Sequence, residues 1–345
     1  YRVAAVTRLV LYAHKPHVQF TSGTKFQLAN KWPTHWLGDL LINVKKPVEM
    51  SGESNYRELD PNVFYGQETS TSRWINLGLW VGGCKMKYSV ACESMAAAVG
   101  SFAKLNPGDK VIDVGCGFGD SLMLWRNRYG CKQVVGVNIT KGECDVARER
   151  IKKQDNMENI QVLNEDAMVY LNKVDKLDGK VVSVDAMVNV NNRRTFLNRL
   201  GDVLTLEQGC KTFTAIDTFG TTNFLAENGS IWESFISSPF KFSFVYIVSV
   251  CGGIPLDNLM YKIESLESNL SLREDVSVRI LDQSDVTDLV FVPFSQHMLS
   301  KSWNAFCSGN MLSSVTLLSA ALFMRLLGVS SLFRVYLYSV EYFEC

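Results

Sequence analysis

The sequence has no CxxC pair, only four histidines and no excess of charge of either sign. Its 345 residues include 35 Lys and Arg against 35 Asp and Glu. This balance argues against nucleic acid as a partner, because phosphate binding depends on clustered Lys and Arg. The nine cysteines lack the spacing of a zinc cage, and most lie far from a histidine. We therefore expect no metal site, no disulfide framework and a reducing, cytoplasmic setting.

Long uncharged apolar runs are also scarce. The strongest one, residues 311–324, contains several serines and is followed by Arg325, which favours a packed helix over a membrane span. Apolar stretches at 235–251 and 311–333 leave association with a membrane surface open. The chain begins at Tyr1 without a methionine, so a removed N-terminal targeting signal is also left open.

The chain does have a large apolar fraction, 47%, and only 8 prolines, which predicts an ordered fold. A length of 345 residues exceeds one minimal core. We expect an N-terminal cap at 1–88, a cofactor-binding core at 89–219, an insertion over the active site at 220–275 and a C-terminal part at 276–345 that completes the sheet.

Short β-branched runs alternate with longer amphipathic stretches along the core. Buried, non-alternating strands separated by helices predict a doubly wound, mostly parallel sheet. Two later strands, at 276–283 and 333–343, predict an antiparallel addition at one edge and seven strands in all. The other expected strands are 110–115, 133–139, 160–166, 180–188 and 211–219, and the expected helices of the core are 89–104, 121–130, 141–154 and 192–204.

The most informative segment is VIDVGCGFGD, residues 111–120, in which a buried strand runs into three glycines at alternate positions. Glycine is needed where the backbone turns sharply or a ligand approaches closely. A dinucleotide site requires G-x-G-x-x-G, but Asp120 stands where its third glycine would be. Asp113 and Asp120 would also repel a pyrophosphate. A nicotinamide oxidoreductase is therefore a poor interpretation.

The pattern D-x-G-C-G-x-G-D resembles motif I of class I S-adenosylmethionine-dependent methyltransferases, whose cofactor carries a sulfonium and no phosphate. The flanking segments FYG…RWINLGLW and GFGDSLMLW…VVGVNITKGECDVARERI resemble the small-molecule branch, which includes tocopherol, sterol and sugar O-methyltransferases and cyclopropane-fatty-acid synthases. The resemblance covers residues 65–345. It implies a Rossmann-like methyltransferase fold, S-adenosyl-L-methionine as cofactor and a small-molecule acceptor.

The resemblance also implies which residues hold the cofactor. Asp113 would orient the glycine loop or hold the amino group of the cofactor. Asn138 stands where many relatives have Asp or Glu for the ribose, and an amide binds hydroxyls more weakly than a carboxylate. Asp166 and Ala167 would flank the adenine. The full implied set is Asp113, Gly115, Cys116, Gly117, Gly119, Asn138, Ile139, Asp166, Ala167 and Asp185.

Asp185, after the fourth strand, would lie beside the reacting methyl group. Relatives often show D-x-x-x-H-x-x-x-R here, but Asn189 replaces that histidine. Without this base, transfer to an unactivated hydroxyl is disfavoured and nitrogen, sulfur or carbon nucleophiles stay open. Holding the partners in line can contribute ~7–11 kcal/mol without acid–base help. The candidate catalytic residues are Asp185, Asn189 and His297, with a structural or exposed role as the alternative for His297.

Aromatic faces stabilise a sulfonium or an ammonium by roughly 0.5–2 kcal/mol each. We expect Tyr65, Trp74, Trp80 and Phe118 around the acceptor, with core packing as the alternative for the tryptophans. The prediction is a methyltransferase for a small, hydrophobic amine, alkaloid-like compound, lipid, sterol or isoprenoid. The alternative, based on the two asparagines, is a cofactor-binding scaffold or partner protein with impaired chemistry. A homodimer is left open.

Overall fold

The structure is a computed structural model, and it describes residues 71–155, 157–204, 212–221, 249, 254–259, 261–268, 270 and 276–344. Most of the expected N-terminal cap, residues 1–70, lies outside the described residues, and Tyr65 lies outside them too. The same holds for most of the expected insertion, 222–253 apart from residue 249. The expected subdivision of the chain therefore stays a prediction.

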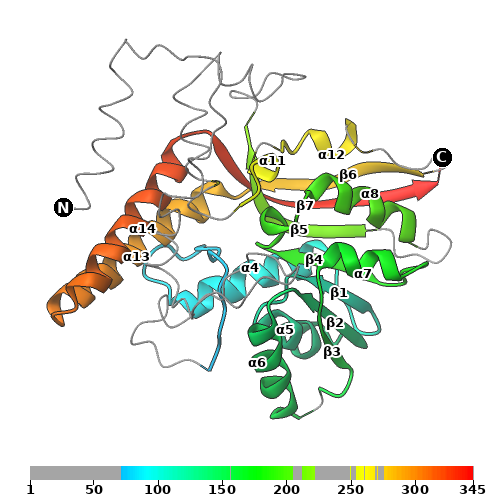
Figure 1. Cartoon of the computed structure of the whole chain (residues 1–345), viewed down its shortest axis with the longest axis horizontal. Coiled ribbons are helices and arrows are strands. Elements are labelled where there is room, and N and C mark those ends of the chain that lie inside the picture. The colour runs from blue at the N-terminus through cyan, green and yellow to red at the C-terminus, as the bar shows by residue number, and fades with distance from the viewer. Residues whose placement is uncertain are drawn as a thin grey trace, which may run out of the picture. The chain divides into compact units, whose positions relative to one another are not determined.

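One seven-stranded sheet forms the centre of the described part, in the order β3-β2-β1-β4-β5-β7-β6 (Figure 1). Strands β1 to β5 pair in parallel, whereas β7 runs antiparallel to both β5 and β6. The predicted doubly wound sheet with an antiparallel last strand is confirmed. The strands are β1 (Lys110–Val114), β2 (Gln133–Asn138), β3 (Ile160–Asn164), β4 (Lys180–Val184), β5 (Thr212–Gly220), β6 (Val276–Asp285) and β7 (Phe333–Glu344).

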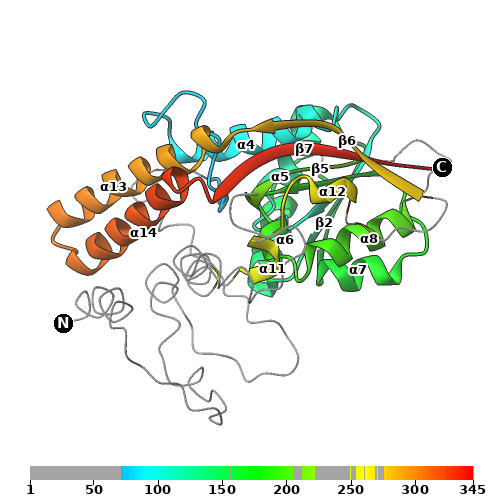
Figure 2. The same cartoon turned by 90° about the horizontal axis from the view of Figure 1, so that it is seen from above.

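Helices cover both faces of this sheet (Figures 1 and 2). On one face, α4 (Tyr88–Phe102), α5 (Asp120–Tyr129) and α6 (Lys141–Lys152) contribute to one buried cluster. On the other, α7 (Ala167–Lys173), α8 (Arg193–Val203) and α12 (Ser265–Ser268) contribute to a second. Because both faces are covered, the central strands are almost wholly buried, which explains their continuous apolar runs. The short α11 (Leu256–Leu259) lies within the expected insertion, 220–275, as α12 does.

The structure differs from the sequence-based expectation at three places. The fourth strand ends at Val184, not at 188, because Asp185 has a left-handed backbone (φ 55°) and a 3₁₀ turn, η2 (Met187–Asn189), follows. Helix α7 was not expected from the sequence. The long apolar stretch before β7 is two helices, α13 (Phe291–Cys307) and α14 (Met311–Val329), after a second 3₁₀ turn, η4 (Thr287–Leu289).

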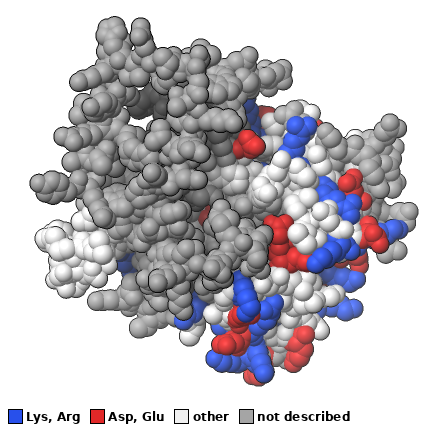
Figure 3. Space-filling model, viewed as in Figure 1, with Lys and Arg blue, Asp and Glu red and all other residues white. Residues whose placement is uncertain are grey.

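Helices α13 and α14 lie side by side as a hairpin (Figures 1 and 2). By length and composition alone, α14 could cross a membrane, but a third of the residues in its apolar window are buried within the fold. Elsewhere, acidic and basic side chains are interspersed over the visible surface around α6, α7 and α8 (Figure 3). Charges of both signs are thus mixed on this part of the visible surface.

Candidate active site

The glycine loop joins β1 to α5 and explains why three glycines alternate there. Gly115, Gly117 and Gly119 all have positive φ angles, of 81°, 49° and 84°. A Cβ on Gly115 would lie 2.3 Å from Ala186 Cβ, and one on Gly119 would lie 3.0 Å from Ala147 Cβ. A Cβ on Gly117 would meet nothing nearer than 3.5 Å. Two of the glycines therefore permit packing, and Gly117 keeps room free beside the loop.

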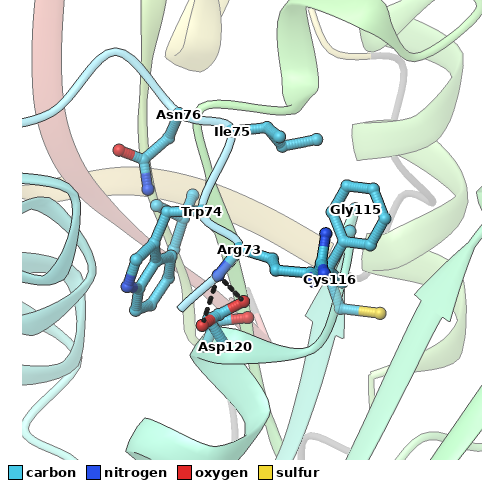
Figure 4. A pocket seen from close by; sticks show the side chains of 11 residues that line it. Arg73, Trp74, Ile75, Asn76, Gly115, Cys116 and Asp120 are labelled. Carbon is cyan, nitrogen blue, oxygen red and sulfur yellow. Dashed lines mark hydrogen bonds between the residues drawn. The ribbon is translucent and has the colours of Figure 1, made fainter. Parts of the chain in front are cut away.

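A small cavity of about 40 Å³ lies between this loop and residues 71–77, which we call the strap (Figure 4). The strap crosses the carboxyl end of the sheet, where parallel α/β folds place their ligands. The cavity is lined by Arg73, Trp74, Ile75, Asn76, Gly115, Cys116, Gly117, Phe118, Asp120, Ser121 and Val184. The sequence patterns had indicated Trp74, Phe118 and the loop, but not the other members of the strap, Ser121 or Val184.

Asp120 and Arg150 hold the first half of the strap. The Asp120 carboxylate accepts the backbone N–H of Arg73, at 3.1 and 3.2 Å from its two oxygens (Figure 4). The Arg150 guanidinium binds the same carboxylate through both terminal nitrogens, at 2.6 and 2.8 Å. Arg150 also donates to the carbonyl oxygens of Phe118 and Thr71. Such bidentate pairs are strong and directional, so this clasp fixes the strap on the glycine loop.

Asp185 holds the second half. Its Oδ2 accepts the backbone N–H of Leu77 at 2.9 Å, while its own N–H donates to Ile216 O. Burial, opposed by the hydrogen bond from Leu77 and helped by the neighbouring Asp217 carboxylate, raises the pKa of Asp185 to about 7. Asp185 therefore changes its ionisation state near neutral pH.

A buried ion pair lies behind Asp185. Arg193 Nη2 is 2.9 Å from Asp217 Oδ2, and neither side chain has any exposed surface. The Arg193 guanidinium also donates to Thr218 O and lies 4.5 Å above the ring of Phe219. Burial raises the pKa of Asp217, and the Arg193 charge opposes that rise. This pair joins the start of α8 to the end of β5.

Asp113 lies inside the strand rather than in the cavity. Its Oδ2 accepts the indole N–H of Trp125 at 2.7 Å, and it is 1% exposed. Burial raises the pKa of Asp113 to about 6, against the hydrogen bonds from Ser121 and Trp125. The structure thus places Asp113 in β1, where its carboxylate ties α5 to the strand through Trp125.

The end of β2 contains a carboxylate that the sequence patterns did not indicate. Asn138 Nδ2 donates to Glu143 Oε2 at 2.8 Å, and Glu143 is 2% exposed in the first turn of α6. A buried carboxylate thus lies beside the Asn138 amide at the end of β2. Its signal was a glutamate on the apolar face of α6, beside Cys144 and Ala147.

The end of β3 is tied by local hydrogen bonds. Asp166 caps α7, since its Oδ1 accepts the backbone N–H groups of Met168 and Val169 at 2.8 and 3.2 Å. Ala167 is the first residue of that helix. Asn164 Nδ2 donates to Ile139 O at 2.8 Å and so joins β3 to the loop after β2. The Asp166 carboxylate that would meet a ligand is therefore also the group that caps α7.

The expected aromatic and catalytic residues divide into two groups. Trp74 and Phe118 line the cavity. Trp80 is 1% exposed, and its ring lies 5.2 Å from that of His297, which stacks on Tyr88 at 5.3 Å. This buried aromatic cluster is separate from the residues that line the cavity. Asn189 is the last residue of η2, one short turn after Asp185.

We expect Arg150→Met to loosen the strap. The variant keeps the length of the side chain but removes the bidentate pair, so limited trypsin digestion should cut after Arg73 at least about fivefold faster, on the scale of one charged hydrogen bond. Mass spectrometry locates the cut. Arg148→Met, two residues earlier on α6 and outside the clasp, is the matched control, and equal rates for the two variants would contradict the clasp.

We also expect stability to depend on pH through Asp185. A carboxyl pKa raised to about 7 means that the folded chain holds this proton more tightly than the unfolded chain. The free energy of unfolding should therefore fall as the pH rises from about 4 to 7, by up to about 1.4 kcal/mol per pH unit for one proton, and level off above pH 7. Urea titrations should show a shallower fall for Asp185→Asn. The exposed Asp178→Asn variant is the control, and an unchanged slope in Asp185→Asn would disprove the assignment.

Comparisons with known proteins agree with this architecture. Residues 89–237 match the mycolic acid cyclopropane synthetase family. The chain is 24% identical over 247 residues to erythromycin 3''-O-methyltransferase of Saccharopolyspora erythraea, covering 68% of this chain and 71% of that protein. It is 26% identical over 151 residues to the O-methyltransferase resE of Aspergillus sclerotiorum, covering 42% of this chain and 56% of the relative.

Solved structures share the fold. The cyclopropane synthase MmaA2 from Mycobacterium tuberculosis aligns with a TM-score of 0.57 and 13% identity, over 81% of this chain and 94% of that one. The mycolic acid cyclopropane synthase CmaA1, solved with SAH and CTAB, aligns with a TM-score of 0.56 and 14% identity, over 81% and 93%. The chain is therefore similar to S-adenosylmethionine-dependent methyltransferases, and residues 89–237 match the mycolic acid cyclopropane synthetase family.

Proposed function

We propose that the protein positions a small hydrophobic acceptor for in-line methyl transfer. The observation that carries this proposal is the cavity between the strap and the glycine loop, which is lined by Trp74 and Phe118 and left open at Gly117. Bound S-adenosylmethionine supplies an electrophilic methyl group on a sulfonium. The aromatic rings that line the cavity would stabilise this positive charge without a negatively charged side chain.

The residues present fit this cofactor. Gly117 leaves free the space that a Cβ would fill, and the loop offers backbone groups in place of a phosphate site. We propose that the glycine loop with Cys116 and the strap hold the amino-acid end. Asn138 and Glu143 would bind the ribose hydroxyls, because the buried Glu143 restores the stronger acceptor. Ile139, Asp166 and Ala167 would border the adenine.

Asp185 is the residue that we propose to act nearest the reacting atoms. It fixes the strap through Leu77, and its raised pKa lets it accept a proton near neutral pH. Asn189 has an amide side chain, which cannot take up a proton as the histidine of relatives could. It would therefore orient the acceptor by hydrogen bonding. We propose that His297, buried among Trp80 and Tyr88, supports the strap from outside rather than transferring a proton.

The acceptor we propose is a hydrophobic amine, an alkaloid-like compound or a lipid, sterol or isoprenoid, attacked at nitrogen, sulfur or carbon. The relatives' names support a bulky apolar acceptor, since they include erythromycin and mycolic acid. The alternative, a scaffold with impaired chemistry, is not favoured, because glycine loop, strap and Asp185 form one connected site.

We further propose a reducing, cytoplasmic setting and contact with a membrane surface. The cysteine pattern supports the first, because no CxxC pair is present. The apolar stretch 311–333 supports the second. Alternatively, the same stretch would form the interface of a homodimer, which a measurement of the molecular mass in solution would detect.

Two measurements test the proposed function. Isothermal titration should show binding of S-adenosylmethionine and S-adenosylhomocysteine. Incubation with methyl-labelled cofactor and a cellular lipid and metabolite extract should then yield a labelled product in the organic phase. Binding without any labelled product would favour the scaffold, and absence of binding would overturn both proposals.

A further inference from the structure

The α13–α14 hairpin has an exposed apolar face that methyl transfer does not require. On α14, exposed apolar side chains recur every three or four residues from Met311 to Val329, which is one continuous face of the helix. We call the whole surface the apolar face, and its most prominent members are Leu299, Trp303 and Phe306 of α13 and Leu312, Leu318 and Leu322 of α14.

Side chains of both helices contribute to the apolar face, and they point to the surface rather than into the core. Trp303, Phe306 and Leu318 line one groove of about 670 Å³ between the helices. The rings of Trp303 and Phe306 stack with their centres 5.7 Å apart. Trp303 is nevertheless 65% exposed and Leu312 is 73% exposed. An exposed patch of this kind marks an interaction surface.

The charges of the hairpin have one sign. Residues 291–329 contain no Asp or Glu, and their only Lys and Arg residues are Lys301 and Arg325. The lobe at the left edge of Figure 3, where the end of the hairpin emerges, shows no acidic or basic side chain. A chain with balanced charges overall thus has a hairpin that is apolar at its end and has two charged side chains of Lys or Arg type, Lys301 and Arg325.

We propose that the apolar face docks on a lipid bilayer that contains anionic lipids. Tryptophan and phenylalanine with flanking Lys or Arg favour the boundary between head groups and acyl chains, and each cation adds attraction to an anionic surface. A second copy fits less well, because a symmetric contact would set this face against itself without any acid to pair with the cations. The helix lies along the surface rather than crossing it, because its other side packs within the fold.

Docking there would bring the bilayer to the methyl-transfer site. The base of α13 packs through His297 against Trp80, and the backbone N–H of Trp80 donates to Leu289 O at 2.9 Å. Trp80 lies three residues after Leu77, the last residue of the strap, and its indole donates to Leu77 O. The docked hairpin is thus joined to the strap over the cavity, which suits a lipid acceptor; this last step rests on the proposed function.

The test is co-sedimentation of the full chain with phosphatidylcholine vesicles, with and without phosphatidylglycerol. We expect binding to the anionic vesicles that weakens with salt. Trp303→Glu and Leu312→Glu should each lower the partition coefficient at least about fivefold, and Arg325→Gln about fivefold on anionic vesicles only. Leu281→Glu makes the same change at an exposed position on β6 and should bind like the unaltered chain.

Three outcomes would overturn the docking proposal. They are no sedimentation with either vesicle, equal binding by Trp303→Glu and the Leu281→Glu control, or a dimer in solution that Trp303→Glu dissociates while vesicles bind nothing. The last outcome would identify a second copy as the occupant. Titration of S-adenosylmethionine into the same variants tests the proposed function separately, because these exposed residues lie outside the cavity lining.

Discussion

Gly117→Arg is expected to lower the affinity for S-adenosylmethionine by at least about 100-fold, which corresponds to about 2.7 kcal/mol. The new side chain would start 3.5 Å from Ile75 and grow into a cavity of about 40 Å³. The left-handed φ of 49° adds backbone strain for any residue other than glycine. Isothermal titration with S-adenosylmethionine measures the loss.

A matched control separates the filled cavity from the strained backbone. Gly83 also has a positive φ, 72°, but a Cβ there would meet nothing within 4 Å. Gly83→Arg should therefore bind the cofactor normally even if it lowers the melting temperature slightly. Normal binding by Gly117→Arg would show that the cofactor does not pass over this part of the loop.

The largest effect on stability is expected from Arg193→Met. The variant leaves the Asp217 carboxylate buried without its partner, and breaking a buried pair in this way costs about 3–5 kcal/mol of unfolding free energy. The pKa of Asp217, already raised by burial, should rise further, so part of the loss should be recovered at low pH. Urea unfolding at pH 5 and pH 8 measures both effects.

Arg279→Met is the control for this variant. Arg279 pairs with Glu341 at 2.7 Å, but the arginine side chain is 61% exposed. Exposed pairs contribute about 0–1 kcal/mol, so this variant should unfold nearly like the original chain. If Arg193→Met lowered the free energy of unfolding no more than Arg279→Met does, the buried ion pair would contribute no more to stability than an exposed one.

Sequence patterns predicted the sheet well, because a strand that is buried on both faces shows its apolar and β-branched residues within its own short segment. Runs such as KVIDV and TFTAIDTFG can be identified without knowing their neighbours. Their ends were harder, since the fourth strand stops where Asp185 turns left-handed to meet Leu77, 108 positions away in sequence. Helix α7 was missed because seven residues give too little periodicity.

The site was predicted less completely than the sheet, for a related reason. The glycine loop is a local motif, so its residues were indicated directly. Arg150 and Glu143 act across space, and only the fold brings them to Asp120 and Asn138. Trp80 and His297 had the residue types of a site but lie in a buried aromatic cluster, and composition alone cannot distinguish these cases.

The strap is held by two carboxylates, Asp120 at the N–H of Arg73 and Asp185 at the N–H of Leu77. Asp120 is paired with Arg150, whereas Asp185 accepts only a backbone N–H among the contacts described and has a pKa of about 7. A cation placed near Asp185 lowers that pKa, so binding of a sulfonium there would release protons to the solvent, and a neutral thioether product would release fewer. Under the proposed cofactor placement, replacing the product with S-adenosylmethionine would thus release protons through Asp185, the same carboxylate that holds the strap at Leu77.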